Sequence, residues 1–174
     1  MSHVRLITAY VGLGSNLGDR AGNLSRARDA LAGLGKVAAT SSMYETAPWG
    51  VDEPQPAYFN QVVALETGLQ AGELIKRFLE IEAQSGRQRT RPGSSRVIDI
   101  DLLLYGDTAI DEPGVTVPHP RMHLRAFVLV PLAEIAPGAT VPGLGRTVRE
   151  LAKETGSAGV RRMHGVTDRM EGGG

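Results

Sequence analysis

Two aspartates occupy alternate positions in the segment most typical of a β-strand, SSRVIDIDLLLYG at residues 94–106. Side chains alternate between the two faces of a strand, so Asp99 and Asp101 are expected on one face. Leu103 and Tyr105 should follow them there. The opposite face is expected to be apolar and to consist of Ile98, Ile100, Leu102 and Leu104. Two carboxylates at this spacing repel each other and are costly to desolvate, which makes the pair unusual in an apolar strand.

Two kinds of partner could stabilise this pair of carboxylates. Ion pairing with neighbouring Arg residues would be purely structural. A divalent cation would also remove the repulsion, because Mg²⁺ typically binds one or two carboxylates, keeps several waters and completes its shell with phosphate oxygens. On the spacing alone, both interpretations are open.

Four arginines precede this strand within ten residues: Arg87, Arg89, Arg91 and Arg96. A solvated basic loop would need no function. Its position beside the aspartates nevertheless favours a polyphosphate substrate, because guanidinium groups bind phosphate oxygens in a bidentate geometry and loop closure excludes water. We therefore expect a mobile, Arg-rich loop at residues 87–96. Glu82, one helical turn earlier, could be no more than an acid on a helix surface.

Two other motifs resemble known binding motifs but lack one required element. GLGSNLG at residues 12–18 has the spacing GxGxxxG and lacks the Gly-Lys pair of a P-loop, so it is predicted to be a structural strand-to-helix turn, with phosphate contact as the lesser alternative. His119 and His123 are four residues apart, but Pro120 stands where a zinc protease motif has its glutamate. Zinc is therefore not expected, and His119 is instead a candidate phosphate ligand.

The Pro-rich segment ETAPWGVDEPQPAY contains two aromatic residues, and an Asn follows it closely. The residues are Trp49, Tyr58 and Asn60. Aromatic side chains near prolines often serve packing alone. An Asn between aromatic rings could also recognise a flat heterocycle, because its amide both donates and accepts hydrogen bonds.

The composition limits the class of protein and its partners. The 174 residues suit one domain, expected at residues 1–160, with a partly disordered tail at 161–174. The absence of Cys excludes disulfides and thiolate chemistry. The net charge is zero, so neither nucleic acid nor an anionic membrane is an expected partner. A cytoplasmic location is expected, because no apolar run reaches the length of a signal or a membrane span. We also expect a monomer.

Hydrophobic periodicity predicts the elements that must position these residues. Strands are predicted at residues 6–13, 37–44 and 59–67 and in the aspartate segment; helices are predicted before Gly35 and at 71–85, 124–135 and 148–154, with a hairpin turn at 106–107. The order β-α-β-β-α-β predicts an α+β fold, a ferredoxin-like βαββαβ sheet with helices packed on one face.

Five motifs in the same order resemble the family of 6-hydroxymethyl-7,8-dihydropterin pyrophosphokinases. The family signature stands here as RVIDIDLL at residues 96–103, and its N-terminal pattern as GSNLG at 14–18. The pterin-loop pattern is YETAPWG followed by YFN, and VPHP is followed by RAF and PL. This resemblance covers about residues 6–135. It implies Mg²⁺-dependent transfer of the pyrophosphoryl group of ATP to the 6-hydroxymethyl oxygen of the reduced pterin, with release of AMP, in folate biosynthesis.

The resemblance also implies roles for individual residues. Asp99 and Asp101 would bind two Mg²⁺ ions, and either could accept the proton of the hydroxyl. Contacts with ATP or its migrating group are implied for Arg87 and Arg96, counted with the aspartates as catalytic, and for Glu82, Arg89, Leu102, Thr116, His119 and Arg125. Tyr58 and Phe127 would enclose the pterin, and Asn60 would bind its edge. The pterin subsite would be completed by Thr46, Ala47 and Trp49.

The chain departs from the family in the loop before the signature arginine. The family has Trp-Gly-Pro there, whereas this chain has Gly93, Ser94 and Ser95 and is one residue shorter. An aromatic side chain that helps to cover the substrates is therefore missing. This difference predicts a lid that closes less completely.

Three other classes of protein are compatible with parts of the pattern. Another Mg²⁺-dependent polyphosphate enzyme, such as a hydrolase, would use the aspartates but not Tyr58 and Asn60. A ligand-binding module without activity would not need both aspartates. A nucleic-acid reader would depend on the Arg-rich loop alone, and the zero net charge argues against it.

Overall fold

The computed structural model describes residues 5–47, 56–86 and 97–163. The Arg-rich loop at 87–96 lies outside these residues, as do Trp49 and the last eleven residues of the predicted tail. Within the described ranges, no helix combines the length and the apolar character needed to cross a membrane.

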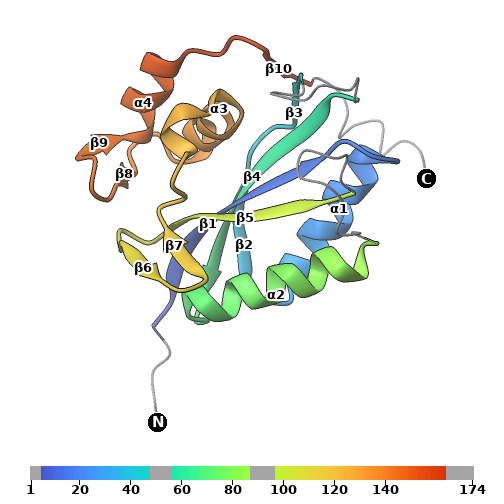
Figure 1. Ribbon diagram of the computed structural model, residues 1–174, viewed down its shortest axis with the longest axis horizontal. Coiled ribbons are helices and arrows are strands. Elements are labelled where there is room, and N and C mark those ends of the chain that lie inside the picture. The colour runs from blue at the N-terminus through green and yellow to red at the C-terminus, as the bar shows by residue number, and fades with distance from the viewer. Residues whose placement is uncertain (1–4, 48–55, 87–96, 164–174) are drawn as a thin grey trace.

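Among the described residues, six strands form one antiparallel sheet at the centre of the molecule (Figure 1). Their order is β10-β3-β4-β1-β5, and β2 pairs with a further stretch of β4. The strands are β1 (Ile7–Ser15), β2 (Lys36–Thr40), β3 (Tyr44–Thr46), β4 (Tyr58–Thr67), β5 (Asp99–Tyr105) and β10 (Val160–Arg162). The antiparallel sheet with its helices confirms the predicted α+β class.

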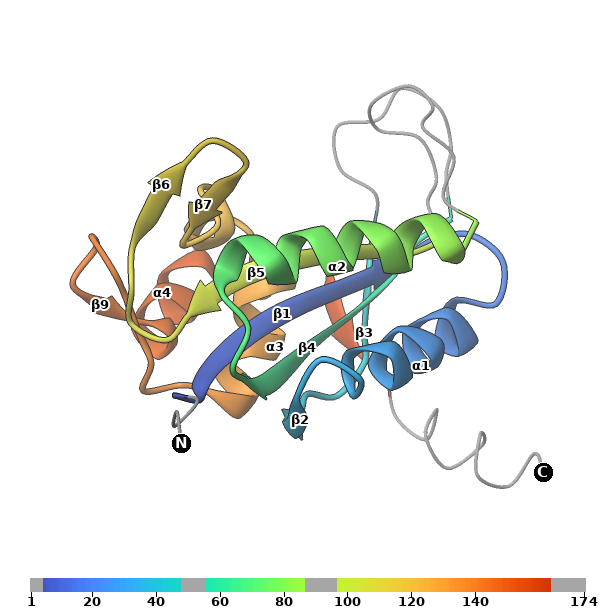
Figure 2. The same ribbon diagram turned by 90° about the horizontal axis from the view of Figure 1, so that it is seen from below.

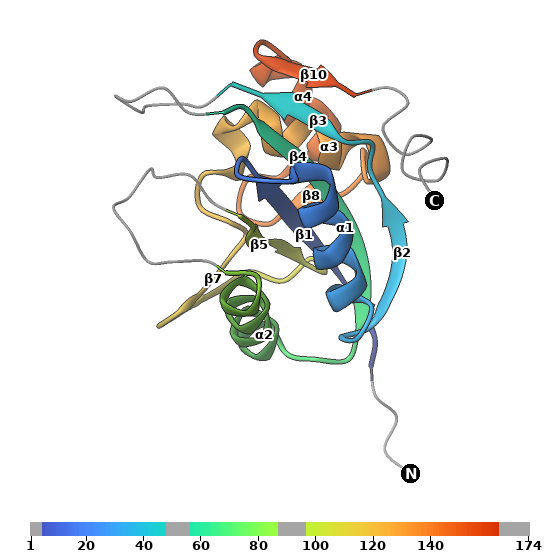
Figure 3. The same ribbon diagram turned by 90° about the vertical axis from the view of Figure 1, so that its right-hand side faces the viewer.

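Helices cover both faces of this sheet (Figure 2, Figure 3). One face carries α1 (Arg20–Leu31) and α2 (Ala71–Gln84), and the other carries α3 (Ala126–Ile135) and α4 (Val148–Thr155). The prediction of helices on one face is therefore right for the first pair and wrong for the second. The reason is that the central strands are apolar on both sides: in β4, Val63 packs in the cluster with α1 and α2, and its neighbour Val62 packs with α3 and α4.

Short-range signals explain where the helices begin and which side they bury. Asp19 caps α1, because its Oδ1 accepts a hydrogen bond from the backbone N–H of Gly22 at 3.1 Å. The buried residues of α2 recur at helical spacing: Ala71, Leu74, Phe78 and Glu82. Thr147 and Glu150 form a reciprocal capping box at the start of α4. Both α2 and α4 agree with prediction to within one residue.

A β-bulge changes the faces of β5 after the aspartates. Val11 of β1 pairs with Leu102, and Tyr10, the residue before it, pairs with Leu104. Leu103 is therefore an extra residue in β5 between two consecutive pairs. Leu104 consequently packs with Leu103 in the α3–α4 cluster. The prediction that Leu104 shares the other apolar face is therefore wrong. Tyr105 likewise turns to the α2 side, where its hydroxyl donates to the Leu69 carbonyl at 2.6 Å.

Two strand boundaries also differ from prediction. β1 continues to Ser15, so Gly14 lies in the strand and not in the predicted turn, whereas Gly12 already belonged to the strand predicted at 6–13. The strand predicted at 37–44 is divided into β2 and β3. Ser41 lies between β2 and β3 and is bonded to β4: its backbone N–H donates to the Val62 carbonyl, and its hydroxyl accepts from the Val62 N–H.

The chain after β5 forms short elements that lead to α3 and α4. The turn predicted at 106–107 is present and is closed by a bridge between Tyr105 and Thr108. The helix predicted from residue 124 begins instead with a turn of 3₁₀ helix, and α3 starts at Ala126. The short elements are β6 (Ile110–Glu112), β7 (Val115–Val117), the 3₁₀ turn η1 (Met122–Leu124), β8 (Thr140–Val141) and β9 (Arg146–Thr147).

The last described strand extends the sheet into the predicted tail. Arg161 and Arg162 belong to β10 and pair with Glu45 and Tyr44 of β3. The division into a domain and a tail stays a prediction, but these two residues are part of the sheet.

Candidate active site

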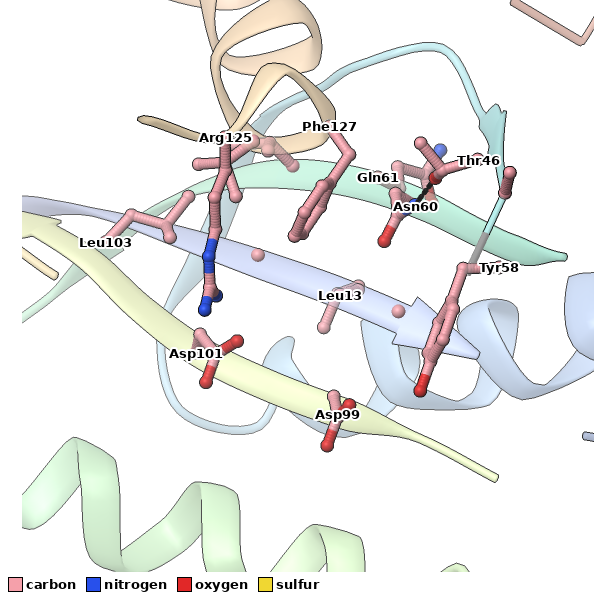
Figure 4. A pocket seen from close by; sticks show the side chains of 15 residues that line it. Leu13, Thr46, Tyr58, Asn60, Gln61, Asp99, Asp101, Leu103, Arg125 and Phe127 are labelled. Carbon is pink, nitrogen blue, oxygen red and sulfur yellow. Dashed lines mark hydrogen bonds between the residues drawn. The ribbon is translucent and has the colours of Figure 1, made fainter. Parts of the chain in front are cut away.

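Two neighbouring hollows meet at the aspartate pair. The smaller, of about 270 Å³, lies over β1, β4 and β5 beside the start of α3 (Figure 4). The larger, of about 700 Å³, lies between α2, β5, β7 and residues 119–125. Four side chains line both hollows: Tyr58, Asp99, Asp101 and Arg125. A ligand in one hollow would therefore meet a ligand in the other at the carboxylates.

The register of β1 against β5 leaves space in front of the carboxylates. Asp99 stands opposite Gly14, and Asp101 stands opposite Gly12. Because these two partners have no side chains, the backbone of β1 forms part of the floor of the smaller hollow. Both carboxylates lie on the same side of β5, as predicted (Figure 4).

The aspartate pair suits a cation that completes its shell with other oxygens. Asp101 is exposed and Asp99 is half-buried, so water and substrate oxygens can reach both carboxylates. Within the described residues, no cluster of three or more His, Cys, Asp or Glu could enclose a metal ion. Two accessible carboxylates match the one or two that Mg²⁺ typically binds beside phosphates.

The walls of the smaller hollow combine aromatic rings with one fixed amide. Phe127 from α3 and Tyr58 from β4 enter it from different sides (Figure 4). Asn60 is 7% exposed, and its Nδ2 donates to Thr46 Oγ1. Its Oδ1 is thereby turned toward the cavity (Figure 4), where it can accept a hydrogen bond from a flat ligand. Ala47 also lines this hollow.

Cationic and neutral donors stand at the junction with the larger hollow. Arg125 precedes α3, its Cζ lies 5.6 Å from the centre of the Phe127 ring, and its guanidinium extends toward Asp101 (Figure 4). Burial, with Arg125 and Arg121 nearby, lowers the pKa of His119 below its usual 6.5. Its Nδ1 accepts from the Arg121 backbone N–H at 3.4 Å, so the neutral ring carries its proton on Nε2. A neutral His119 between two arginines can donate to a phosphate oxygen from Nε2.

Glu82 is not the surface acid that its sequence position allowed. Its side chain is 3% exposed, and its Oε2 accepts from the backbone N–H of Ile100 at 2.8 Å. It therefore binds the backbone of β5 between the two aspartates. Glu82 also lines the larger hollow, together with Leu102 and Thr116.

The structure brings most of the predicted site residues together. Those lining one or both hollows are Thr46, Ala47, Tyr58, Asn60, Glu82, Asp99, Asp101, Leu102, Thr116, His119, Arg125 and Phe127. Outside the described residues are Trp49, Arg87, Arg89 and Arg96. His123 is not among the lining residues, although it shares a motif with His119.

Sequence reasoning missed the two glycines that form the floor. Both belonged to the predicted turn at 12–18, Gly12 also to the strand predicted at 6–13, and neither was named as a site residue, whereas both lie in β1 and line the smaller hollow. An alanine Cβ at position 14 would lie only 3.0 Å from Asn60 Oδ1. Their alternation at period two was the available signal, because it places both glycines on one face of a strand.

Comparisons with known proteins identify the class and the family. The model of the family 7,8-dihydro-6-hydroxymethylpterin-pyrophosphokinase (HPPK) matches residues 10–137. The chain belongs to this family, as its motifs predicted, and it is a pyrophosphokinase, a diphosphotransferase of folate biosynthesis.

Relatives and solved structures support this assignment over most of the chain. A 2-amino-4-hydroxy-6-hydroxymethyldihydropteridine pyrophosphokinase of Methylorubrum extorquens is 43% identical over 157 residues, covering 89% of this chain and 98% of the relative. The Haemophilus influenzae enzyme of the same name is 40% identical, covering 86% and 93%. The wild-type Plasmodium falciparum HPPK-DHPS crystal structure with pteroate has a TM-score of 0.67 at 16% identity, over 88% of this chain and 43% of that one. The last similarity concerns the fold alone, and this chain spans less than half of that structure's chain.

Proposed function

We propose that this chain transfers the pyrophosphoryl group of ATP to the 6-hydroxymethyl oxygen of 7,8-dihydro-6-hydroxymethylpterin and releases AMP. The observation that carries the proposal is the meeting of two hollows at Asp99 and Asp101. One hollow has aromatic walls and a fixed amide, and the other is larger and bordered by cationic groups. Phosphoryl-type transfer depends mainly on alignment and on stabilisation of charge, which such an arrangement can supply.

The pterin would occupy the smaller hollow. Tyr58 and Phe127 would contact the faces of its ring, and Asn60 would accept a hydrogen bond from its edge through Oδ1. Thr46 supports this orientation, because it accepts the other end of the Asn60 amide. Ala47 would contribute backbone contacts. Trp49 keeps its predicted role here.

ATP would occupy the larger hollow, with its polyphosphate toward the aspartates. His119 and Arg125 would bind phosphate oxygens, in keeping with their position at the junction of the hollows. The remaining contacts with the nucleotide are proposed for Glu82, Leu102 and Thr116. The predicted contacts of Arg87, Arg89 and Arg96 with the migrating group remain part of this proposal.

Asp99 and Asp101 would hold two Mg²⁺ ions. Bound there, Mg²⁺ would neutralise polyphosphate charge and ease ionisation of the pterin hydroxyl. Either carboxylate could then accept the hydroxyl proton, since both face the hollow. The walls of the smaller hollow would exclude water from the reacting oxygen, which favours transfer over hydrolysis.

Three further predictions belong to the same proposal. The strand order β5-β1-β4-β3, with α1 and α2 on one face, supports a ferredoxin-like core to which α3 and α4 are added. The missing Trp-Gly-Pro sequence predicts weaker closure over the substrates. The protein is proposed to act as a cytoplasmic monomer.

Release of AMP tests the proposal directly. Purified protein with ATP and Mg²⁺ should form AMP only when 7,8-dihydro-6-hydroxymethylpterin is present, in equal amount to the pterin diphosphate. AMP or ADP formed without the pterin would favour a polyphosphate hydrolase instead. Chelation of the metal should stop the reaction, and activity that persists with excess chelator would contradict the role of Mg²⁺.

A further inference from the structure

Glu134 connects two walls of the smaller hollow without lining it. It lies in the last turn of α3, the helix that begins beside Arg125 and carries Phe127. Its carboxylate contacts the segment that leads into β3, about 90 residues earlier in the chain. Thr46 at the end of β3 belongs to the opposite wall.

Three donors share the Glu134 carboxylate. Oε2 accepts from the backbone N–H of Ser42 at 2.8 Å and from its hydroxyl at 3.1 Å. Oε1 accepts from the Tyr44 hydroxyl at 2.6 Å. Hydrogen bonds to an ionised acceptor are shorter and stronger than neutral ones, so this group is a firm connection between α3 and β3.

The Tyr44 hydroxyl stays protonated and donates its hydrogen bond to Glu134 at neutral pH. Tyr44 is 7% exposed. Burial and the hydrogen bond to Glu134 raise the pKa of Tyr44 to about 12, so the hydroxyl remains a donor at neutral pH. If Glu134 were removed, the buried hydroxyl would lose the partner that this connection supplies.

Tyr44 lies directly beside the amide of the smaller hollow. In the register of β3 against β4, Tyr44 pairs with Asn60 and Thr46 pairs with Tyr58. Tyr44 and Thr46 share a face of β3, because they are two residues apart. Asn60 donates to Thr46 on that face. A shift of Tyr44 would therefore move both ends of the Asn60–Thr46 hydrogen bond.

The other face of β3 has ion pairs of its own. Glu45 pairs with Arg161 at 2.7 Å and with Arg20 at 3.7 Å. The Arg161 side chain is 73% exposed, and exposed ion pairs contribute little. Glu134 is also exposed, and of its bonds only the one with the Tyr44 hydroxyl is partly buried, so that bond is the contact through which it can act on β3.

We propose that Glu134 is a positioning residue for the pterin subsite: through Tyr44 it sets the distance between Phe127 on α3 and the Asn60–Thr46 pair on the sheet. This inference rests on the proposed function, since it assumes that the pterin occupies the smaller hollow. Glu134 acts only through Tyr44 and Ser42 and touches neither hollow. Its loss should therefore affect pterin binding and leave nucleotide binding unchanged.

Steady-state kinetics of Glu134→Gln, Tyr44→Phe and the double variant test the proposal. Glutamine keeps the size of the side chain, but its NH₂ group replaces one of the two oxygens that accept hydrogen bonds from Ser42 and Tyr44. In each single variant, KM for the dihydropterin should rise about tenfold, equivalent to about 1.4 kcal/mol, while KM for ATP stays within about twofold. The double variant should be no worse than the more affected single variant, because both substitutions break one connection. Glu154→Gln is the matched control, since its exposed carboxylate on α4 pairs with Arg146 of β9 and not with a residue of β3.

Several results would overturn the inference. An unchanged KM for the pterin, an equal rise in both KM values, or additive effects in the double variant would each show that Glu134 does not position this subsite through Tyr44. A wild-type protein without pterin-dependent release of AMP would refute the proposed function, and this inference with it. Normal wild-type activity with unaffected variants would refute this inference alone. Tyr44→Phe removes a single hydroxyl, so it keeps the test open if Glu134→Gln does not fold.

Discussion

Replacing Gly14 with alanine should disturb pterin binding through a single atom. The added Cβ would lie 3.0 Å from Asn60 Oδ1 and 3.6 Å from Tyr58 Cδ1. Carbon–oxygen contacts of this kind are ordinarily about 3.3–3.6 Å, so the Asn60 oxygen must retreat by about 0.3–0.6 Å. It cannot do so freely, because Nδ2 of the same amide is bonded to Thr46.

The size of the effect follows from the hydrogen bond that Asn60 offers to the ligand. Loss of such a bond costs about 0.5–1.5 kcal/mol, and about 1–3 kcal/mol when a buried partner is left unsatisfied. Gly14→Ala should therefore raise the Kd for the pterin about 10- to 100-fold, at about 1.4 kcal/mol for each factor of ten. The fold should not suffer, because alanine in an extended strand reduces the conformational freedom of the unfolded chain.

Fluorescence titration with 6-hydroxymethylpterin, in the presence of Mg²⁺ and a non-hydrolysable ATP analogue, measures this effect. Gly12→Ala is the matched control: it lies on the same face of β1, but its Cβ would meet three atoms of the Leu103 side chain at 3.4, 3.5 and 3.6 Å, which are ordinary contacts. The control should bind within about threefold of wild type, taking about 1 kcal/mol as the limit of a tolerated contact. Equal Kd values in all three proteins would refute the placement of the ligand against Asn60. Equal weakening in both variants would show that the volume of the cavity decides binding.

Three other properties can be predicted. Binding of ATP should raise the pKa of His119, because phosphate charge offsets the burial and the neighbouring Arg125 and Arg121 that lower it. An NMR titration of its ring in which ATP leaves the pKa unchanged would contradict this. Between about pH 10 and 12 the free energy of unfolding should fall more steeply with pH in wild type than in Tyr44→Phe. The reason is that the Tyr44 phenol stays protonated in the native state up to a pKa of about 12, whereas it ionises near 10 in the unfolded state. Parallel curves for the two proteins would count against this prediction. Leu74→Ala should lower the free energy of unfolding by about 2–5 kcal/mol because the side chain is fully buried, and a denaturant titration showing less than about 1 kcal/mol would exclude that packing.

Local periodicity predicted those parts of the candidate site that are set within a single strand or helix. Asp99 and Asp101 share one face because a strand alternates, and the side chains of α2 point inward because a helix repeats every 3.6 residues. The motifs named Tyr58 and Asn60 of the proposed pterin subsite, and both line the smaller hollow because they lie on one face of β4. These features need no knowledge of the rest of the fold.

Other features depend on contacts between distant segments and could not be read from local patterns. The bulge at Leu103 arises from the register of two strands, and it moves Leu104 to the opposite face. Glu82 is buried because the backbone N–H of Ile100 supplies its partner, 18 residues later. Glu134 meets Tyr44 across 90 residues. Charged side chains are usually exposed, so their burial depends on partners that only the folded chain supplies.

The central claim is that both substrates react at the two aspartates, and single-turnover pyrophosphoryl transfer by Asp101→Asn tests it most directly. The variant keeps the shape of the side chain and removes its charge. We predict a transfer rate lower by at least about 10²–10³, the effect typical of removing one group that stabilises the transition state. The Kd for the pterin should stay within about threefold, or about 0.7 kcal/mol, because its ring contacts lie elsewhere. A rate within about tenfold of wild type, or a rate loss fully explained by weaker pterin binding, would contradict the claim.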